Sequence, residues 1–118
     1  MTYADFLDDW EREADAEYEA YLRRPPEALV SDAEYGRYGE YYQLWRAIAA
    51  RATLASAGKV LLDVVHRDDP YLVRYHAAKA LLTLLGTTEL QPVDLSGNRP
   101  RRAANLERVS EMLRERTH

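Results

Sequence analysis

Hydrophobic and polar positions alternate with helical periodicity along most of this chain. Apolar residues recur at three- and four-residue steps, which places them on one face of an α-helix. The pattern predicts helices over residues 3–22, 32–52, 57–66, 70–85 and 100–116. Pro, Gly and other turn-forming residues separate most of these segments. We therefore expect an all-α fold of about five helices, with residues 1–118 forming a single domain.

The first predicted helix is strongly amphipathic. Thr2 and Asp5 match a capping box, in which a hydroxyl and a carboxylate three residues later satisfy free backbone N–H groups. Its apolar stripe consists of Tyr3, Phe6, Leu7, Trp10, Ala14, Tyr18 and Tyr21. The acidic residues of the other side are Asp5, Asp8, Asp9, Asp15 and Glu19. We expect the stripe to pack against the rest of the protein and the acidic face to meet solvent.

The second predicted helix repeats the capping-box pattern with Ser31 and Glu34, and it carries Gly36 and Gly39 on its polar side. Each Gly costs about 1 kcal/mol relative to Ala in a helix interior. The fourth predicted helix is apolar over more than half of its circumference, which is typical of a helix packed on several sides. The predicted core comprises Trp10, Tyr42, Trp45, Leu61, Val65, Val73, Ala77, Leu81 and Leu84.

Residues 59–86 form a pattern of two helices joined by a tight acidic turn. Pro70 suits the start of the second helix, and Gly86 suits its end. The hairpin resembles one HEAT/armadillo-type repeat, on the strength of Asp68, Val73-Arg74, Ala77-Ala78 and Leu81. Residues 41–86 are also similar to a family of small bacterial HEAT-like proteins of uncharacterised function. These resemblances imply HEAT-like helical hairpins in a compact bundle or a short superhelix, and they add no chemistry.

The same resemblance implies a structural ladder. In HEAT-like repeats an Asp in the turn and an Arg six residues later tie neighbouring repeats together, and here these positions are Asp68 and Arg74. Arg74 also falls on the apolar arc of its helix, where a guanidinium needs a partner. We expect Arg74 to pair with the carboxylate of Asp63, Asp68 or Asp69.

The composition narrows the class of protein. Of 118 residues, 47% are hydrophobic and 31% are charged, which is ordinary for a soluble globular domain. The chain has no cysteine, which excludes disulfides and thiolate metal sites and fits a reducing cytoplasm. Acidic residues stand where a signal peptide needs a basic and then an apolar stretch, and the apolar runs are far shorter than the ~20 residues of a membrane span. We expect a cytoplasmic protein.

Charge is distributed unevenly along the chain. Residues 1–43 hold 12 Asp and Glu against 4 Lys and Arg, a net of −8, whereas residues 44–118 hold 8 against 12, a net of +4. An acidic end can steer a basic partner towards it, although it can also serve solubility alone. We expect Asp5, Asp8, Asp9, Asp15 and Glu19 to contribute to recognition of a basic protein.

Candidate chemistry is sparse. The chain has no Gly-rich phosphate loop, nucleophile elbow or His-Glu-x-x-His pattern. His66 and His76 are separated by a turn at a spacing that matches no short metal motif. Acidic pairs such as Asp8 and Asp9 are more typical of a solvated helix face than of acid–base catalysis. The sequence therefore predicts no enzymatic activity, cofactor or metal.

Two functions remain open. The preferred one is a non-enzymatic protein–protein interaction module, in particular an inhibitor or immunity-type protein that masks a basic partner such as a nuclease. The alternative is a nucleic-acid- or nucleotide-associated accessory domain that uses the basic cluster Arg99, Arg101 and Arg102. The net charge of −4 disfavours nucleic acid, which is usually bound by a broad basic face.

Overall fold

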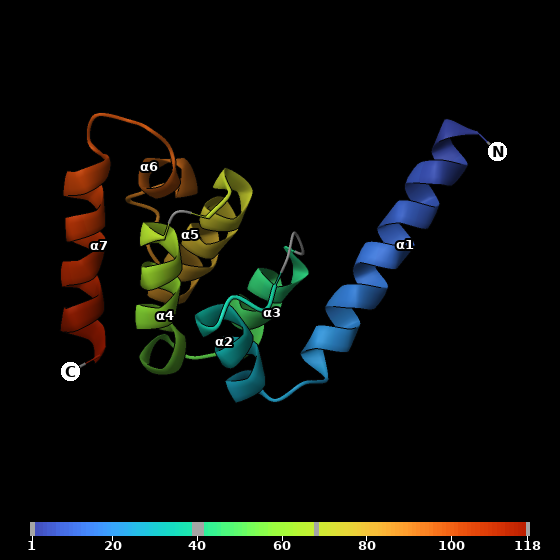
Figure 1. Ribbon diagram of the computed structural model, residues 1–118, viewed down its shortest axis with the longest axis horizontal. Coiled ribbons are helices and arrows are strands. Elements are labelled where there is room, and N and C mark those ends of the chain that lie inside the picture. Colours follow the sequence, from blue (N-terminus) through green and yellow to red (C-terminus); the bar gives the residue numbers. More distant parts are fainter. Residues whose placement is uncertain (1, 39–41, 68, 118) are drawn as a thin grey trace.

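The computed structural model describes residues 2–38, 42–67 and 69–117, and in this part of the chain helices are joined by turns and loops (Figure 1). The helices of this described part are α1 (Tyr3–Leu22), α2 (Pro26–Glu34), α3 (Gln43–Arg51), α4 (Leu54–His66), α5 (Tyr71–Leu85), α6 (Pro92–Ser96) and α7 (Arg102–Thr117). The expected all-α class is confirmed, since these residues include no strand. The expected number of helices is wrong, because seven are present where about five were predicted.

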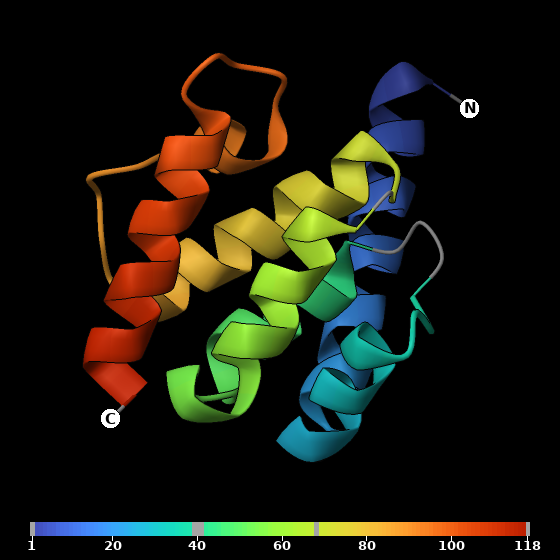
Figure 2. The same cartoon turned by 60° about the vertical axis from the view of Figure 1, so that its left-hand side comes forward.

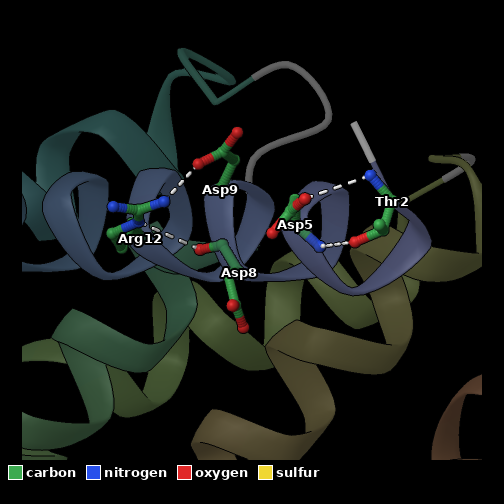
Figure 3. A network of polar contacts seen from close by, with 5 residues as sticks. All are labelled: Thr2, Asp5, Asp8, Asp9 and Arg12. Carbon is green, nitrogen blue, oxygen red and sulfur yellow. Dashed lines mark hydrogen bonds and ion pairs between the residues drawn. The ribbon is translucent and has the colours of Figure 1, made fainter.

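Helix α1 has the predicted bounds and the predicted cap. The backbone N–H of Asp5 donates to Oγ1 of Thr2 at 3.2 Å, and the backbone N–H of Thr2 donates to the Asp5 carboxylate at 3.0 Å (Figure 3). These two bonds satisfy donors that a helix start leaves free. The helix ends at Leu22, shortly before Pro25.

The single helix predicted over residues 32–52 is wrong, because α2 and α3 take its place. Helix α2 starts at Pro26, whose fixed φ suits the first helical position, so Ser31 lies inside the helix and is not its cap. The chain then leaves the helix, and Gly36 adopts a φ of +73°, a left-handed conformation that glycine allows at little cost. Gly39, the other predicted glycine of this helix, lies outside the described residues.

Smaller differences occur at the other predicted boundaries. Helix α4 begins three residues earlier than predicted, because Thr53 forms a capping box with Ser56. Gly86 ends α5 with a φ of +67°, as predicted. The short helix α6 lies between the helices predicted over 70–85 and 100–116, where no helix was predicted. Asp94 caps it by accepting the backbone N–H of Gln91 at 2.8 Å.

The core is built around α5, which packs against α3, α4 and α6, while α7 covers α4 and α6 (Figures 1 and 2). Six of the predicted core residues are buried: Trp45, Leu61, Val65, Val73, Ala77 and Leu81. Tyr42 and Leu84 are partly buried and pack against this core. The prediction for Trp10 is wrong, because 52% of the residue is exposed.

The exposure of Trp10 follows from the course of α1. Its C-terminal half packs against α3, and Tyr18, Tyr21 and Leu22 are partly buried there. Its N-terminal half stands away from the other helices (Figure 1). The predicted packing stripe therefore packs only over the second half of the helix.

Arg74 is partly buried, and its described hydrogen bonds go to backbone carbonyls. Its Nε donates to the carbonyl of Asp69 at 3.1 Å, and its Nη1 donates to the carbonyl of Ser96 at 3.2 Å. The guanidinium thereby joins α5 to the end of α6. Asp68 lies outside the described residues, so the ladder of Asp68 with Arg74 stays a prediction.

Asp32 joins α2 to the segments on both sides of it. Its buried carboxylate accepts from Nη1 of Arg24 at 2.5 Å and from Nε of Arg37 at 3.1 Å. Burial alone would raise the pKa of Asp32, but the hydrogen bonds and charges of the two arginines outweigh it and lower the pKa below its ordinary value. Asp32 is therefore ionised at neutral pH and holds the start and end of α2 in place.

Asp32→Asn is expected to lower the free energy of unfolding by roughly 1–2 kcal/mol at pH 7. The loss is modest because Arg24 and Arg37 are exposed, and solvent weakens their ion pairs with Asp32. Because the pKa of Asp32 is lower in the folded protein than in the unfolded chain, where it is about 3.9, the ionised carboxyl stabilises the folded state at pH values above about 3.9. This contribution to the free energy of unfolding is lost as the pH falls through the folded-state pKa. Urea unfolding at pH 7 and below pH 3 checks both points, with the exposed Glu34→Gln as control. An equal difference between wild type and Asp32→Asn at both pH values would contradict this role.

Candidate protein-binding site

The most unusual surface feature is a row of exposed apolar residues on the N-terminal half of α1. We call Tyr3, Phe6, Leu7 and Trp10 the exposed stripe; their exposed fractions are 77%, 55%, 37% and 52%. The same helix face packs on α3 through Tyr18, which follows Leu7 by eleven residues, or about three turns. The exposed stripe is thus a packing face that continues beyond the body of the protein.

Two hollows lie beside α3 and α5, each of about 370 Å³. The first also touches α1, and its described lining includes Tyr18, Tyr42, Trp45, Arg46, His76 and Lys79. The second lies at the start of α5, and its described lining is Tyr42, Trp45, Pro70, Tyr71, Leu72, Val73 and His76. Because Tyr42, Trp45 and His76 line both, the two hollows adjoin one another and extend from α1 to the start of α5.

Aromatic contacts hold this surface in shape. The rings of Tyr42 and His76 stack with centroids 5.1 Å apart, and Trp45 meets Tyr38 edge-on at 5.0 Å. The hydroxyl of Tyr38 donates to the Asp69 carboxylate at 2.9 Å, which ties the turn after α2 to the turn before α5. Burial and the charge of Lys79 lower the pKa of His76, so this imidazole is neutral at pH 7. The shared wall of the hollows is therefore rigid and uncharged.

The C-terminal half of α1 is fastened to α3. The guanidinium of Arg46 lies 4.0 Å from the ring centroid of Tyr18, a cation–π contact, and donates to Oε1 of Gln43 at 2.7 Å. Arg51 donates to the carbonyl of Leu22 at the end of α1. These contacts fix the direction of α1 and hold the exposed stripe away from the body.

The five acids predicted to bind a partner, Asp5, Asp8, Asp9, Asp15 and Glu19, are all exposed. Asp5 is used in the capping box, and Asp9 pairs with Arg12, which also donates to the carbonyl of Asp8 (Figure 3). Helical spacing places the five acids opposite the exposed stripe, so the structure groups them on the outer face of α1. They do not surround the stripe.

Three other acids, outside the predicted binding set, border the exposed stripe. Glu13 and Glu17 continue the row of Phe6 and Trp10 at three- and four-residue steps, and Glu11 follows Leu7 at a four-residue step. All three are exposed. The signal was present in the helical spacing, which separates acids beside an apolar row from acids behind it. We call Glu11, Glu13 and Glu17 the border acids.

The basic cluster Arg99, Arg101 and Arg102 is largely committed to the fold. Arg102 donates from Nε to the carbonyl of Leu95 at 2.8 Å and from Nη2 to the carbonyl of Val65 at 3.1 Å. Arg99 pairs with Asp94 at 3.6 Å, and Arg101 is exposed. The cluster therefore offers a weaker anion site than its three charges suggested.

Other types of site find no support in the described residues. No three His, Cys, Asp or Glu side chains are grouped there so that they could hold a metal ion. Among the described helices, none combines the length and the apolarity that crossing a membrane requires. Comparisons with protein-family models, with curated proteins and with solved structures found no match.

Proposed function

We propose that this chain is a non-enzymatic protein-binding module whose interface centres on the exposed stripe of α1. The observation that carries the proposal is a well-capped, firmly anchored helix that leaves Tyr3, Phe6 and Trp10 in solvent. Exposed contiguous apolar residues commonly mark interaction sites, and Trp and Tyr are enriched among the residues that dominate binding energy. The neighbouring hollows would extend the interface onto α3 and α5.

The inhibitor or immunity-type role belongs to the same proposal. Helix α1 carries eight acidic residues and one arginine, so a basic protein would be attracted to it over a distance. The α4–α5 hairpin, with its resemblance to a HEAT/armadillo-type repeat, would act as the scaffold that presents α1. A cytoplasmic location in a bacterium fits this role. The nucleic-acid alternative gains no support, because Arg102 and Arg99 already have partners within the protein.

A capture experiment tests the proposal. The intact chain is immobilised, and bound proteins from its source cells are identified and then purified for affinity measurements. We expect the double variant Phe6→Ala/Trp10→Ala to weaken binding at least ~30-fold, because loss of a dominant interface residue costs about 2 kcal/mol or more. Tyr35→Ala is the control, since Tyr35 is 67% exposed but lies in the turn after α2.

The outcomes separate the functional classes. A partner that binds the double variant and wild type equally would place the interface elsewhere and contradict the proposal. Retention of nucleic acid in place of protein, lost on substitution of Arg101, would favour the alternative. Circular dichroism of each variant shows whether the helices remain folded.

A further inference from the structure

We infer that the partner segment recognised by the exposed stripe is a basic amphipathic α-helix. This inference rests on the proposed function and adds the chemistry of the partner: an apolar face flanked by Lys or Arg. Its apolar face would cover Phe6 and Trp10, and its flanking cations would meet the border acids.

The secondary structure of the occupant follows from the surface that it must cover. Every described element of this protein is a helix, whose backbone groups are bonded internally, so the surface provides no strand edge to pair with. A segment buried against side chains alone must satisfy its own backbone N–H and C=O groups. An α-helix does so, and its apolar face of about 100° or more matches a narrow apolar row.

The position of the occupant follows from the apolar surface around the stripe. Along the longest axis of the molecule, the N-terminal half of α1 lies at one end, and the start of α5 lies nearer the middle (Figure 1). At the start of α5, Tyr71 and Leu72 are 43% and 66% exposed and line the second hollow. The occupant is therefore placed along the exposed stripe of α1, and the apolar surface at the start of α5 is a separate one.

The charge of the occupant follows from the acids beside the stripe. Glu13 borders the stripe on one side and Glu11 on the other, while Glu17 lies in line with it at its C-terminal end. Cations flanking an apolar helix face would therefore meet carboxylates on both sides. Arg46 and Lys79 line the first hollow and would repel these cations. The described lining of the second hollow is apolar side chains and the neutral His76, so it would repel a basic helix less than the first hollow does.

The same charges disfavour a second copy of this chain as the occupant. Two α1 helices packed through their stripes would bring together two surfaces that each carry eight acids and one arginine. Like charges placed opposite one another across an interface oppose association. A basic partner removes this repulsion.

Synthetic helices of about 18 residues test the inference against the intact protein. One peptide has a Leu face flanked by Lys, and the second has Glu at every Lys position. A third has the charge of the first with Ser in place of Leu. Fluorescence anisotropy of labelled peptides is expected to show that the Leu–Lys peptide binds at least roughly tenfold more tightly than either of the others, because it alone matches both charge and apolar surface.

Two triple variants with the same change in net charge provide the decisive comparison. Glu11→Gln/Glu13→Gln/Glu17→Gln removes the border acids, and Asp8→Asn/Asp15→Asn/Glu19→Gln removes acids of the outer face. The border variant is expected to lose about tenfold in affinity for the Leu–Lys peptide, and the outer-face variant less than about threefold. Asp5 and Asp9 are left intact because they take part in the cap and in the pair with Arg12.

Equal losses in the two variants would mean unspecific attraction, and the inference would be overturned. If the Leu–Glu peptide binds as tightly as the Leu–Lys peptide, the inferred positive charge of the occupant is wrong. If sedimentation shows a dimer that Trp10→Ala abolishes, the occupant is a second copy of this chain. None of these results contradicts the proposed function. That function fails if a captured partner binds Phe6→Ala/Trp10→Ala as tightly as wild type, or if nucleic acid is retained in place of protein.

Discussion

Leu81→Ala is expected to lower the free energy of unfolding by roughly 2–5 kcal/mol, the range of large-to-small changes in well-packed cores. Leu81 is completely buried in α5, the helix that packs against α3, α4 and α6. Removing its isobutyl group loses the transfer free energy of the buried atoms and leaves a cavity. Helices on several sides restrain collapse into this cavity, which increases the cost.

Urea unfolding followed by circular dichroism measures the effect, with Leu72→Ala as the matched control. Leu72 lies on the same helix but is 66% exposed, so its truncation should change stability by no more than about 0.5 kcal/mol. A loss below ~1 kcal/mol for Leu81→Ala, or equal losses in both variants, would mean that α5 is not central to the core.

The α4–α5 hairpin could be predicted from sequence because local signals agree with the tertiary structure there. Pro70 stands directly before α5, Gly86 ends it in a left-handed conformation, and apolar residues cover most of its circumference. Leu61 and Val65 on α4 are buried as expected. Where helix-end signals and hydrophobic periodicity indicate the same helix, its bounds can be predicted without knowing its tertiary contacts.

The segment between α1 and α4 could not be predicted, because local signals conflict there. Ser31 and Glu34 match the capping-box pattern of a helix start, yet α2 already begins at Pro26. Gly36 then follows the end of α2 at Glu34. The contact that orients the following segment joins Tyr38 to Asp69, 31 residues further along the chain. Periodicity within a short window contains no information about such a partner.

The candidate site shows a different limit of sequence reasoning. Helical spacing identified which residues of α1 share a face, and that grouping is confirmed. It could not say whether another element covers the face, so Trp10 was placed in the core although it is exposed. The predicted acid set was chosen by its distance from the apolar row, so it holds acids of the outer face and none of the border acids. Residues that stay both apolar and uncovered are identified only when the course of the whole helix is known.

The second large effect is expected at Arg102, whose replacement by Ala should lower the free energy of unfolding by about 1.5–3 kcal/mol. The last carbonyls of a helix have no partner within it. Arg102, at the start of α7, donates to the carbonyl of Val65 at the end of α4 and to that of Leu95 in α6. A cation also suits the negative end of a helix dipole, and here one guanidinium serves two such ends.

Arg102→Lys and Arg101→Ala complete the test by urea unfolding. Lysine keeps the charge but lacks the planar fork that lets Nε and Nη2 reach two carbonyls, so it should recover only part of the loss. Arg101→Ala removes the same charge from an exposed neighbour and should change stability by no more than about 0.5 kcal/mol. If the two alanine variants lose equal stability, net charge is responsible and the bridge between α4 and α6 contributes little. If only Arg102→Ala is destabilised, the main role of the basic cluster is structural, because Arg102 joins α7 to α4 and α6.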